Sequence, residues 1–235
     1  VRAVAMLLAL VVDAFFIFFV TGLNPISVYG VMWNGTFMNT TRFSWALRDL
    51  SSLLCIAIAL APAFKMRFWN IGAEGQVLAG GLACAACMIC LANTMPQWLL
   101  IVVMTVASIA VGAIWAAIPG FFKAKWNTNE TLFTLMMNYI AMQLVAYFVI
   151  VWEVPKGAGK IGIINQATRI GWLPQIGEYK YLLNIIIVAL LTVFMYIYLN
   201  YSKHGYEITV VGESERTARY VGINVDRVIV RPVVL

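Results

Sequence analysis

The residues that could do chemistry in this chain are polar side chains placed between long apolar runs. The stretch FWNIGAEGQ, residues 68–76, carries Asn70, Glu74 and Gln76. A carboxylate and two carboxamides are costly in lipid, so such groups face a water-filled cavity or the protein interior. This chemistry suits a path or gate for a polar solute, and Asn70, Glu74 and Gln76 are candidates for that role.

Two interpretations of this stretch remain open from the residues alone. Gly72 and Gly75 disfavour a continuous helix, because glycine weakens a helix interior by about 1 kcal/mol. A broken helix with polar groups at its break is a common way to build a path through a membrane. Alternatively, the stretch is a cytoplasmic loop between two spans, in which Glu74 pairs with Lys65 or Arg67.

A second polar group lies in NTNETLFTLMMNYIA, residues 127–141. Thr131, Thr134 and Asn138 have helical spacing and would form a single stripe on one helix. Such a stripe either makes interhelical hydrogen bonds, typically worth about 0.6–2 kcal/mol each, or forms a polar wall of a translocation path. Thr134 and Asn138 are therefore further candidates for the path or its gate.

An ionisable group also lies within the first apolar run. Asp13, in LVVDAFF, would cost about 2.5–3.5 kcal/mol at the centre of a membrane helix. We expect it to face protein or water, to be protonated, or to lie near the membrane interface. No partner for it is evident in the sequence.

The signatures of catalytic and metal sites are missing. The sequence has no G-x-x-x-x-G-K-[ST] loop, no nucleophile elbow and no H-E-x-x-H motif, and its single histidine is His204. Cys84, Cys87 and Cys90 have a metal-like spacing, but they lie in the apolar stretch CAACMIC with no histidine or carboxylate nearby. We interpret them as packing residues. We expect no catalytic residue, no metal site and no cofactor in this chain.

The composition shows which elements must hold these residues. Of the 235 residues, 63% are hydrophobic and only 11% are charged, which indicates an integral membrane protein. A helix crosses the hydrocarbon core with about 20 residues, and no run alternates as a membrane β-strand does. The sequence predicts an all-α transmembrane domain over residues 1–201, with six spans near 3–23, 50–64, 76–93, 97–122, 131–152 and 181–201.

The connections between these runs carry turn signals and most of the charge. The connection at 24–49 contains the turn signals NP, NG and NTT and is predicted to be external. Pro119 with Gly120 predicts the end of the fourth span. Glycines and prolines predict a long external loop at 153–180. Ten of the 16 Lys and Arg residues lie on the side of the N-terminus, which predicts a cytoplasmic N-terminus. Because the net charge of +6 is spread over the connections, it does not indicate nucleic-acid binding.

The last segment, 202–235, is more polar than the rest and is predicted to be cytoplasmic. Ser214 can cap a short helix that Gly222 ends, and Asn224 can cap a second helix beginning at Val225. A helix-turn-helix DNA reader is disfavoured, because the segment follows a membrane span so closely. The final residues, VIVRPVVL, resemble the beginning of another apolar segment, so we expect that the sequence is incomplete at its C-terminus.

Three motifs occur in one order along the chain: WNIGAEGQ at 69–76, NETLFTLMMNYIA at 129–141 and GYEITVVGESERTARYVGINV at 205–225. With them the chain resembles the permease subunits of bacterial ABC importers of the branched-chain amino acid/ribose permease superfamily. It is most similar to the nucleoside and simple-sugar branch that works with lipoprotein receptors of the BMP type. Thr217 stands where the family usually has alanine, and Asp13 stands where it is usually apolar.

The resemblance implies a type II ABC importer permease fold, with six transmembrane helices, cytoplasmic coupling helices and further C-terminal helices that this chain lacks. It implies docking on a cytoplasmic ABC ATPase, which would bind ATP and Mg²⁺. It also implies a second permease subunit and an extracytoplasmic substrate-binding lipoprotein as partners. The candidate residues for coupling to the ATPase are Glu213, Glu215, Arg216, Arg219 and Gly222.

The sequence therefore predicts a permease subunit in the bacterial plasma membrane that forms the translocation path for nucleosides. Three alternatives remain open. One is a simple-sugar permease of the same class. Another is a proton-coupled secondary transporter that uses Asp13 and Glu74, and the last is a membrane scaffold that transports nothing.

Overall fold

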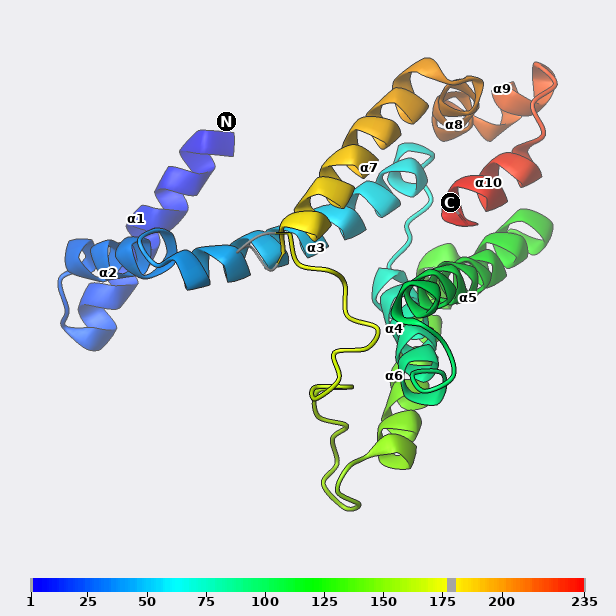
Figure 1. The fold of residues 1–235 in the computed structure, drawn as a ribbon. Helices are drawn as coiled ribbons and strands as arrows, with labels where there is room; N and C mark the ends of the chain where they lie inside the picture. Colours follow the sequence, from blue (N-terminus) through cyan, green and yellow to red (C-terminus); the bar gives the residue numbers. More distant parts are fainter. Residues whose placement is uncertain (1, 177–180, 235) are drawn as a thin grey trace. The chain divides into compact units, whose positions relative to one another are not determined.

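The computed structural model describes residues 2–176 and 181–234. In this part of the chain the regular structure is helical, without a β-strand, as the sequence predicted. The helices follow one another in the order shown in Figure 1. Their bounds are α1 Arg2–Thr21, α2 Pro25–Phe37, α3 Thr40–Lys65, α4 Ala73–Cys90, α5 Gln97–Trp126, α6 Glu130–Trp152, α7 Leu182–Tyr201, α8 Lys203–Glu213, α9 Glu215–Tyr220 and α10 Val225–Val234.

Six of these helices are long and apolar enough to cross a membrane, as judged by length and composition over the described residues. They are α1, α3, α4, α5, α6 and α7, and each overlaps one of the predicted spans. The predicted all-α fold with six transmembrane helices is thus confirmed. Membrane helices keep every backbone group bonded within the segment, which explains why apolar length alone locates them.

The turn signals at 24–49 do not mark turns at most of these positions. Most of this segment is helical, because Asn24 and Pro25 form a helix start instead of a turn. The Asn24 side chain accepts a hydrogen bond from the Ile26 amide (3.0 Å), and Pro25 occupies the first helical position, where no amide is needed. The helix α3 then begins at Thr40, ten residues before the predicted span.

The predicted end of the fourth span at Pro119 and Gly120 is also wrong. The helix α5 continues through both residues to Trp126 and ends where Asn127 takes a left-handed conformation (φ 50°). Both Pro119 and Gly120 are buried. A Cβ at Gly120 would lie 3.7 Å from Val230 on α10, so packing between these helices holds the segment in place. Tertiary contacts of this kind let a membrane helix tolerate an internal proline.

The described residues form two compact units, one from residues 1–53 and 175–186 and the other from 54–174 and 187–235. In the first unit α1 packs on α2. The Tyr29 hydroxyl on α2 donates to the Leu10 carbonyl (2.8 Å) and to Asp13 Oδ2 (3.2 Å). Asp13 therefore has a polar partner on the neighbouring helix, which the sequence alone did not identify.

In the second unit α4 packs against α5 and α6, and α10 lies along α5. Its hydrophobic core joins residues near the end of α3 to the C-terminal helices. Fully or nearly buried members include Phe68, Ile208, Val211, Ala218 and Ile229. The loop that leads out of α3 is thereby packed into the same core as α8, α9 and α10.

The local structure predicted for the C-terminal segment is confirmed. The Ser214 side chain accepts from the Thr217 amide (3.2 Å) at the start of α9, and the Asn224 side chain accepts from the Arg227 amide (3.2 Å) near the start of α10. Gly222 follows α9 in a left-handed conformation (φ 83°). The helix α8 was not predicted, and Ser202 caps it. The assignment of 202–235 to the cytoplasm remains a prediction.

Candidate functional site

The stretch FWNIGAEGQ contains a break between two helices. The helix α3 ends at Lys65 and α4 begins at Ala73, so residues 66–72 lie between two membrane helices. Asn70 lies in this break and is only 4% exposed. Its Oδ1 atom accepts a hydrogen bond from the Gly72 amide (2.8 Å), which fixes the turn of backbone that enters α4.

The helix α6 supplies two side chains that hold the break. Thr134 Oγ1 accepts from the Ile71 amide (3.3 Å). Asn138 uses both ends of its carboxamide, since Oδ1 accepts from the Gly75 amide (2.8 Å) and Nδ2 donates to the Ile71 carbonyl (2.9 Å). We call Asn70, Thr134 and Asn138 the break clamp. The first amides of a helix have no partner within the helix, and the clamp satisfies one of them from a neighbouring helix.

The glycines of the motif are needed for this close approach. A Cβ atom at Gly75 would lie 2.7 Å from Asn138 Oδ1 and 3.1 Å from Asn138 Cα. A Cβ atom at Gly72 would lie 2.9 Å from Asn70 Oδ1 and 3.0 Å from Thr134 Cβ. Gly75 lies within α4, so its role is to admit α6 and not to interrupt the helix.

The clamp changes the interpretation of the predicted polar stripe. Thr134 is fully buried and Asn138 is 4% exposed, so both face the break between α3 and α4. The Thr134 hydroxyl also donates to the Glu130 carbonyl (2.7 Å) of its own helix. The structure thus brings three predicted residues, Asn70, Thr134 and Asn138, into a single arrangement.

Glu74 and Gln76 lie outside the clamp. Glu74 is exposed in the first turn of α4, where the helix dipole favours a carboxylate. It makes no ion pair among the described residues, so the structure does not support the alternative in which Glu74 pairs with Lys65 or Arg67. The Lys65 ammonium instead donates to the Leu199 carbonyl (3.1 Å). Gln76 and Asn70 both line a cavity of ≈ 260 Å³ between helices.

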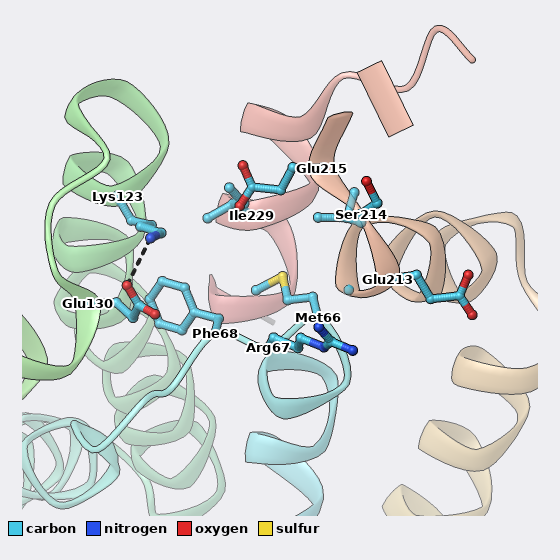
Figure 2. Close-up of a pocket in the computed structure, with 11 residues that line it drawn as sticks. Met66, Arg67, Phe68, Lys123, Glu130, Glu213, Ser214, Glu215 and Ile229 are labelled. Atoms are coloured by element: carbon cyan, nitrogen blue, oxygen red, sulfur yellow. Dashed lines mark ion pairs between the residues drawn. The ribbon is translucent and has the colours of Figure 1, made fainter. Parts of the chain in front are cut away.

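A pocket of ≈ 210 Å³ lies between the break and the predicted coupling segment, and Figure 2 shows the side chains around it. Met66, Arg67 and Phe68 line it from the loop that follows α3, and Glu213 and Glu215 line it from the ends of α8 and α9. Residues from the path motif and from the coupling motif therefore share one pocket.

The same pocket contains an ion pair that the sequence did not reveal. Lys123 Nζ, near the end of α5, lies 2.9 Å from Glu130 Oε2 at the start of α6, as the dashed line in Figure 2 marks. Both side chains are largely buried, with exposed fractions of 19% and 15%. The pair holds the end of α5 against the first residue of α6, the helix that carries Thr134 and Asn138. Its two partners lie on different helices on either side of the connection at 127–129, so the spacing of residues within one helix could not identify the pair.

The predicted coupling residues lie on an exposed face. Glu213, Glu215, Arg216, Arg219 and Gly222 are all exposed. The Arg219 guanidinium pairs with Asp226 Oδ1 (3.2 Å) on α10. On the opposite side of α9 Ala218 is fully buried in the core that contains Phe68. The helix α9 thus has a charged outer face, and its inner face packs into the core that also contains Phe68.

The fold and the site define a class of protein, a multi-pass helical membrane protein with a polar helix break held by a neighbouring span. Residues 42–235 match the family model described as the permease component of the branched-chain amino acid transport system, and the chain belongs to this family. This confirms the superfamily that the three motifs indicated.

Curated relatives agree with this assignment. The guanosine ABC transporter permease protein NupP of Bacillus subtilis is 32% identical over 228 residues, which cover 96% of this chain and 64% of the relative. The glucose ABC transporter permease protein TsgB13 of Haloferax volcanii is 27% identical, over 86% of this chain and 55% of the relative. The nucleoside ABC transporter permease protein NupB of Lactococcus lactis is 25% identical, over 91% and 61%. The chain thus spans less than two thirds of each of these relatives. No solved structure matches it significantly.

Proposed function

We propose that this chain is the membrane permease subunit of an ATP-driven ABC importer for nucleosides, located in a bacterial plasma membrane with its N-terminus in the cytoplasm. The observation that carries the proposal is the 32% identity to a guanosine permease across 96% of the chain. Two of the three curated relatives named above carry a nucleoside in their names, which favours nucleosides over simple sugars as cargo. Because one relative is named a glucose permease, simple sugars are the second candidate for the cargo.

The proposed partners follow from this function. A cytoplasmic ABC ATPase would bind ATP and Mg²⁺, since this chain is proposed to hold no cofactor or catalytic residue of its own. A second permease subunit would complete the translocation path, and an extracytoplasmic lipoprotein would deliver the substrate. The exposed charged face of α9, with Glu215, Arg216 and Arg219, is the proposed docking surface for the ATPase.

The proposed coupling route runs through contacts described above. Movement of α9 would displace Ala218 and the core around it, and Phe68 belongs to that core. Phe68 lies two residues before Asn70, whose carboxamide shapes the entry into α4. A bistable shift of this packed loop would open or close the path on one side of the membrane.

Uptake by whole cells tests the proposal. Cells that express the complete transporter should take up radiolabelled guanosine, and inactivating the partner ATPase should abolish uptake. Uptake that survives ATPase inactivation but collapses with the proton gradient would establish a secondary transporter using Asp13 and Glu74. Unchanged uptake after deletion of the permease, with no ATPase co-purifying, would establish a non-transporting scaffold.

The gate assignment has its own test. Glu74→Gln should impair uptake more than Glu207→Gln, because Glu74 is exposed at the break, whereas Glu207 lies near Arg231 in the C-terminal segment. Near-wild-type uptake in both variants would remove Glu74 from the gate.

A further inference from the structure

The cavity of ≈ 260 Å³ in the second unit is chemically distinctive. It lies between the part of α3 after Leu54, the break, α4, α5 and α10. Three polar side chains line it, those of Asn70, Gln76 and Ser108. The rest of its described wall is aliphatic residues, glycine and one cysteine, Cys55, and none of these residues is charged.

The polar groups in this cavity are not committed to other protein groups. Asn70 accepts a hydrogen bond through Oδ1, but its Nδ2 atom donates to no described residue. The side chains of Gln76 and Ser108 make no hydrogen bond within the described chain. These three side chains therefore retain free donors and acceptors that face one small volume.

Ser108 differs from its neighbour Thr105 in its hydrogen bonding within α5. A serine or threonine within a membrane helix commonly donates to the carbonyl one turn earlier. Thr105, one turn before it on α5, does so by donating to the Ile101 carbonyl (2.7 Å). Ser108 makes no such bond, and its Oγ atom lies close to Gly80 on α4, where an added Cβ would come within 3.0 Å of it. Because the Ser108 hydroxyl has no hydrogen-bond partner among the described residues and lines the cavity, it can bond to a ligand there.

The chemistry of the cavity limits what it can bind. A phosphate would require a cation, and no described Lys or Arg lines the wall. Two carboxamides and a hydroxyl suit a neutral molecule with paired donors and acceptors, and Asn and Gln side chains match the donor and acceptor pattern of a purine edge. The aliphatic wall suits the flat faces of such a ring. The volume of ≈ 260 Å³ lies just below the usual range of ligand cavities, which begins at about 300 Å³, so the occupant is no larger than a nucleoside.

We propose that this cavity is a binding subsite for a neutral nucleoside, with Gln76 and Ser108 as its recognising side chains. The inference rests on the proposed function, and it adds Ser108 and the walls from α3 and α5 to the residues that the motifs indicated. Asn70 links the subsite to the break clamp, because the same carboxamide faces the cavity through Nδ2 and holds the Gly72 amide through Oδ1.

Cys55 offers a direct probe, because it is an exposed thiol on the cavity wall. Cys90 is the matched control, since it is also exposed but does not line the cavity. The complete transporter would be prepared with either Cys55 or Cys90 as its single permease cysteine. Permeabilised membranes would be alkylated with N-ethylmaleimide in the presence of guanosine, guanosine monophosphate or glucose. Guanosine should slow alkylation of Cys55 several-fold and leave Cys90 unchanged, and the charged monophosphate should not protect.

Three outcomes would overturn the inference. The first is an alkylation rate of Cys55 that is equal with and without guanosine, in membranes that still take up guanosine. The second is protection of Cys55 by glucose alone. The third is a Cys55 that never reacts with N-ethylmaleimide because the cavity is closed to water. An equal alkylation rate would contradict the subsite but not the proposed function. Absence of guanosine uptake by the unmodified transporter would contradict the proposed function itself.

Ser108→Ala tests the recognising hydroxyl. Loss of one hydrogen bond should raise the guanosine concentration for half-protection of Cys55 by about two- to tenfold. Thr105→Val is the control, because that hydroxyl is already bonded within its own helix and should not affect protection. An unchanged half-protection concentration in Ser108→Ala would remove Ser108 from the subsite.

Discussion

At the scale of single residues, Asn138 bonds two backbone groups of a neighbouring segment through both ends of its side chain. One carboxamide bonds the Gly75 amide and the Ile71 carbonyl, both on the far side of a helix interface. Asparagine supplies a donor and an acceptor at once, which neither aspartate nor leucine can do. Asn138 is therefore buried in a membrane helix because it forms hydrogen bonds with backbone groups of the neighbouring segment.

Asn138→Ala should destabilise the protein, because it leaves a buried amide and a partly buried carbonyl without partners. Each unsatisfied buried group costs about 1–3 kcal/mol. Thermal unfolding in detergent should show a clearly lower midpoint, together with reduced uptake. Gln143→Ala on the same helix is the control, since Gln143 is exposed and should tolerate the change. Equal midpoints in the two variants would contradict the clamp.

Gly75→Ala tests the close approach separately from the hydrogen bonds. The added Cβ would meet Asn138 Oδ1 at 2.7 Å, so α4 and α6 would have to separate. Gly81→Ala is matched to it on the same helix, because a Cβ at Gly81 meets nothing within 4 Å. We expect the first variant to lower the unfolding midpoint, and the second to leave it unchanged or to raise it, since alanine favours helix by about 1 kcal/mol. A stable, active Gly75→Ala protein would show that the approach is not required.

At the scale of elements, α9 presents two faces with different tasks. Its inner face places Ala218 in the core, and its outer face exposes charges. Gly222 ends it with a left-handed residue, a conformation that favours glycine over any residue with a Cβ atom. The helix is therefore anchored through its inner face, and its charged outer face stays exposed.

Arg219→Glu should abolish substrate-stimulated ATP hydrolysis without unfolding the chain. The Arg219–Asp226 pair is more than half exposed, and such pairs contribute only about 0–1 kcal/mol to stability. Hydrolysis by the reconstituted complex is the measurement, with Lys203→Glu on α8 as the control charge reversal. Restoration of hydrolysis by exchanging the two charges, Arg219→Asp with Asp226→Arg, would indicate that the pair itself matters and not docking through Arg219.

The loop after α6 is held by a carboxylate. Glu153 accepts hydrogen bonds from the Gly157 amide (2.7 Å) and the Gly159 amide (2.9 Å). These bonds lower the pKa of Glu153 below its ordinary value of 4.5, and Lys156 lowers it further while desolvation opposes the shift. Because the pKa is lower in the folded loop, the stabilisation is fully present above pH 4.5 and is lost as the pH falls through the folded value.

Hydrogen exchange can follow this loop. Protection of the Gly157 and Gly159 amides, relative to their intrinsic exchange rates, should fall on acidification below pH 4.5. In Glu153→Gln the protection should be lower at neutral pH and should not change across this range. A protection that stays constant with pH in the unmodified protein would show that the carboxylate does not hold the loop.

At the scale of the whole molecule, the coupling segment and the break belong to one hydrophobic core. Phe68 is 3% exposed and packs in the same core as Ile208, Val211 and Ala218. The charged face of α9 and the clamp on α4 are therefore connected by packed side chains, which have discrete arrangements and are not freely deformable. Such an arrangement suits the transmission of a movement across the protein.

Phe68→Leu should weaken this transmission while keeping an apolar residue in the core. Guanosine uptake by the reconstituted transporter should fall several-fold more than ATP hydrolysis, so that more ATP is used for each molecule transported. Phe64→Leu is the control, because Phe64 is 46% exposed and lies outside this core. An equal loss of both activities would indicate simple destabilisation instead of uncoupling.

The parts of the structure that follow from local rules were predictable from the sequence. Apolar length located six helices, and the caps at Ser214 and Asn224 are set by side chains within three residues of the amides they bond. Contacts between distant segments were not predictable. The helical spacing of Thr134 and Asn138 indicated a polar stripe, but nothing local shows that the stripe faces Ile71 and Gly75. Likewise, α5 continues past Pro119 because α10 packs there, which a turn signal cannot anticipate.

The break clamp also has a consequence for how the protein is made. The bonds from Asn138 reach back 63 and 67 residues along the chain, to Gly75 and Ile71. When a ribosome has delivered α4 to the membrane, the groups at its first turn have no partner until α6 follows. Unsatisfied backbone groups are costly in lipid, so α4, α5 and α6 would leave the insertion machinery as one assembled unit. In a chain stalled before α6, the Gly75 amide and the Ile71 carbonyl would lack these hydrogen-bond partners. We expect cellular quality control to degrade such a chain.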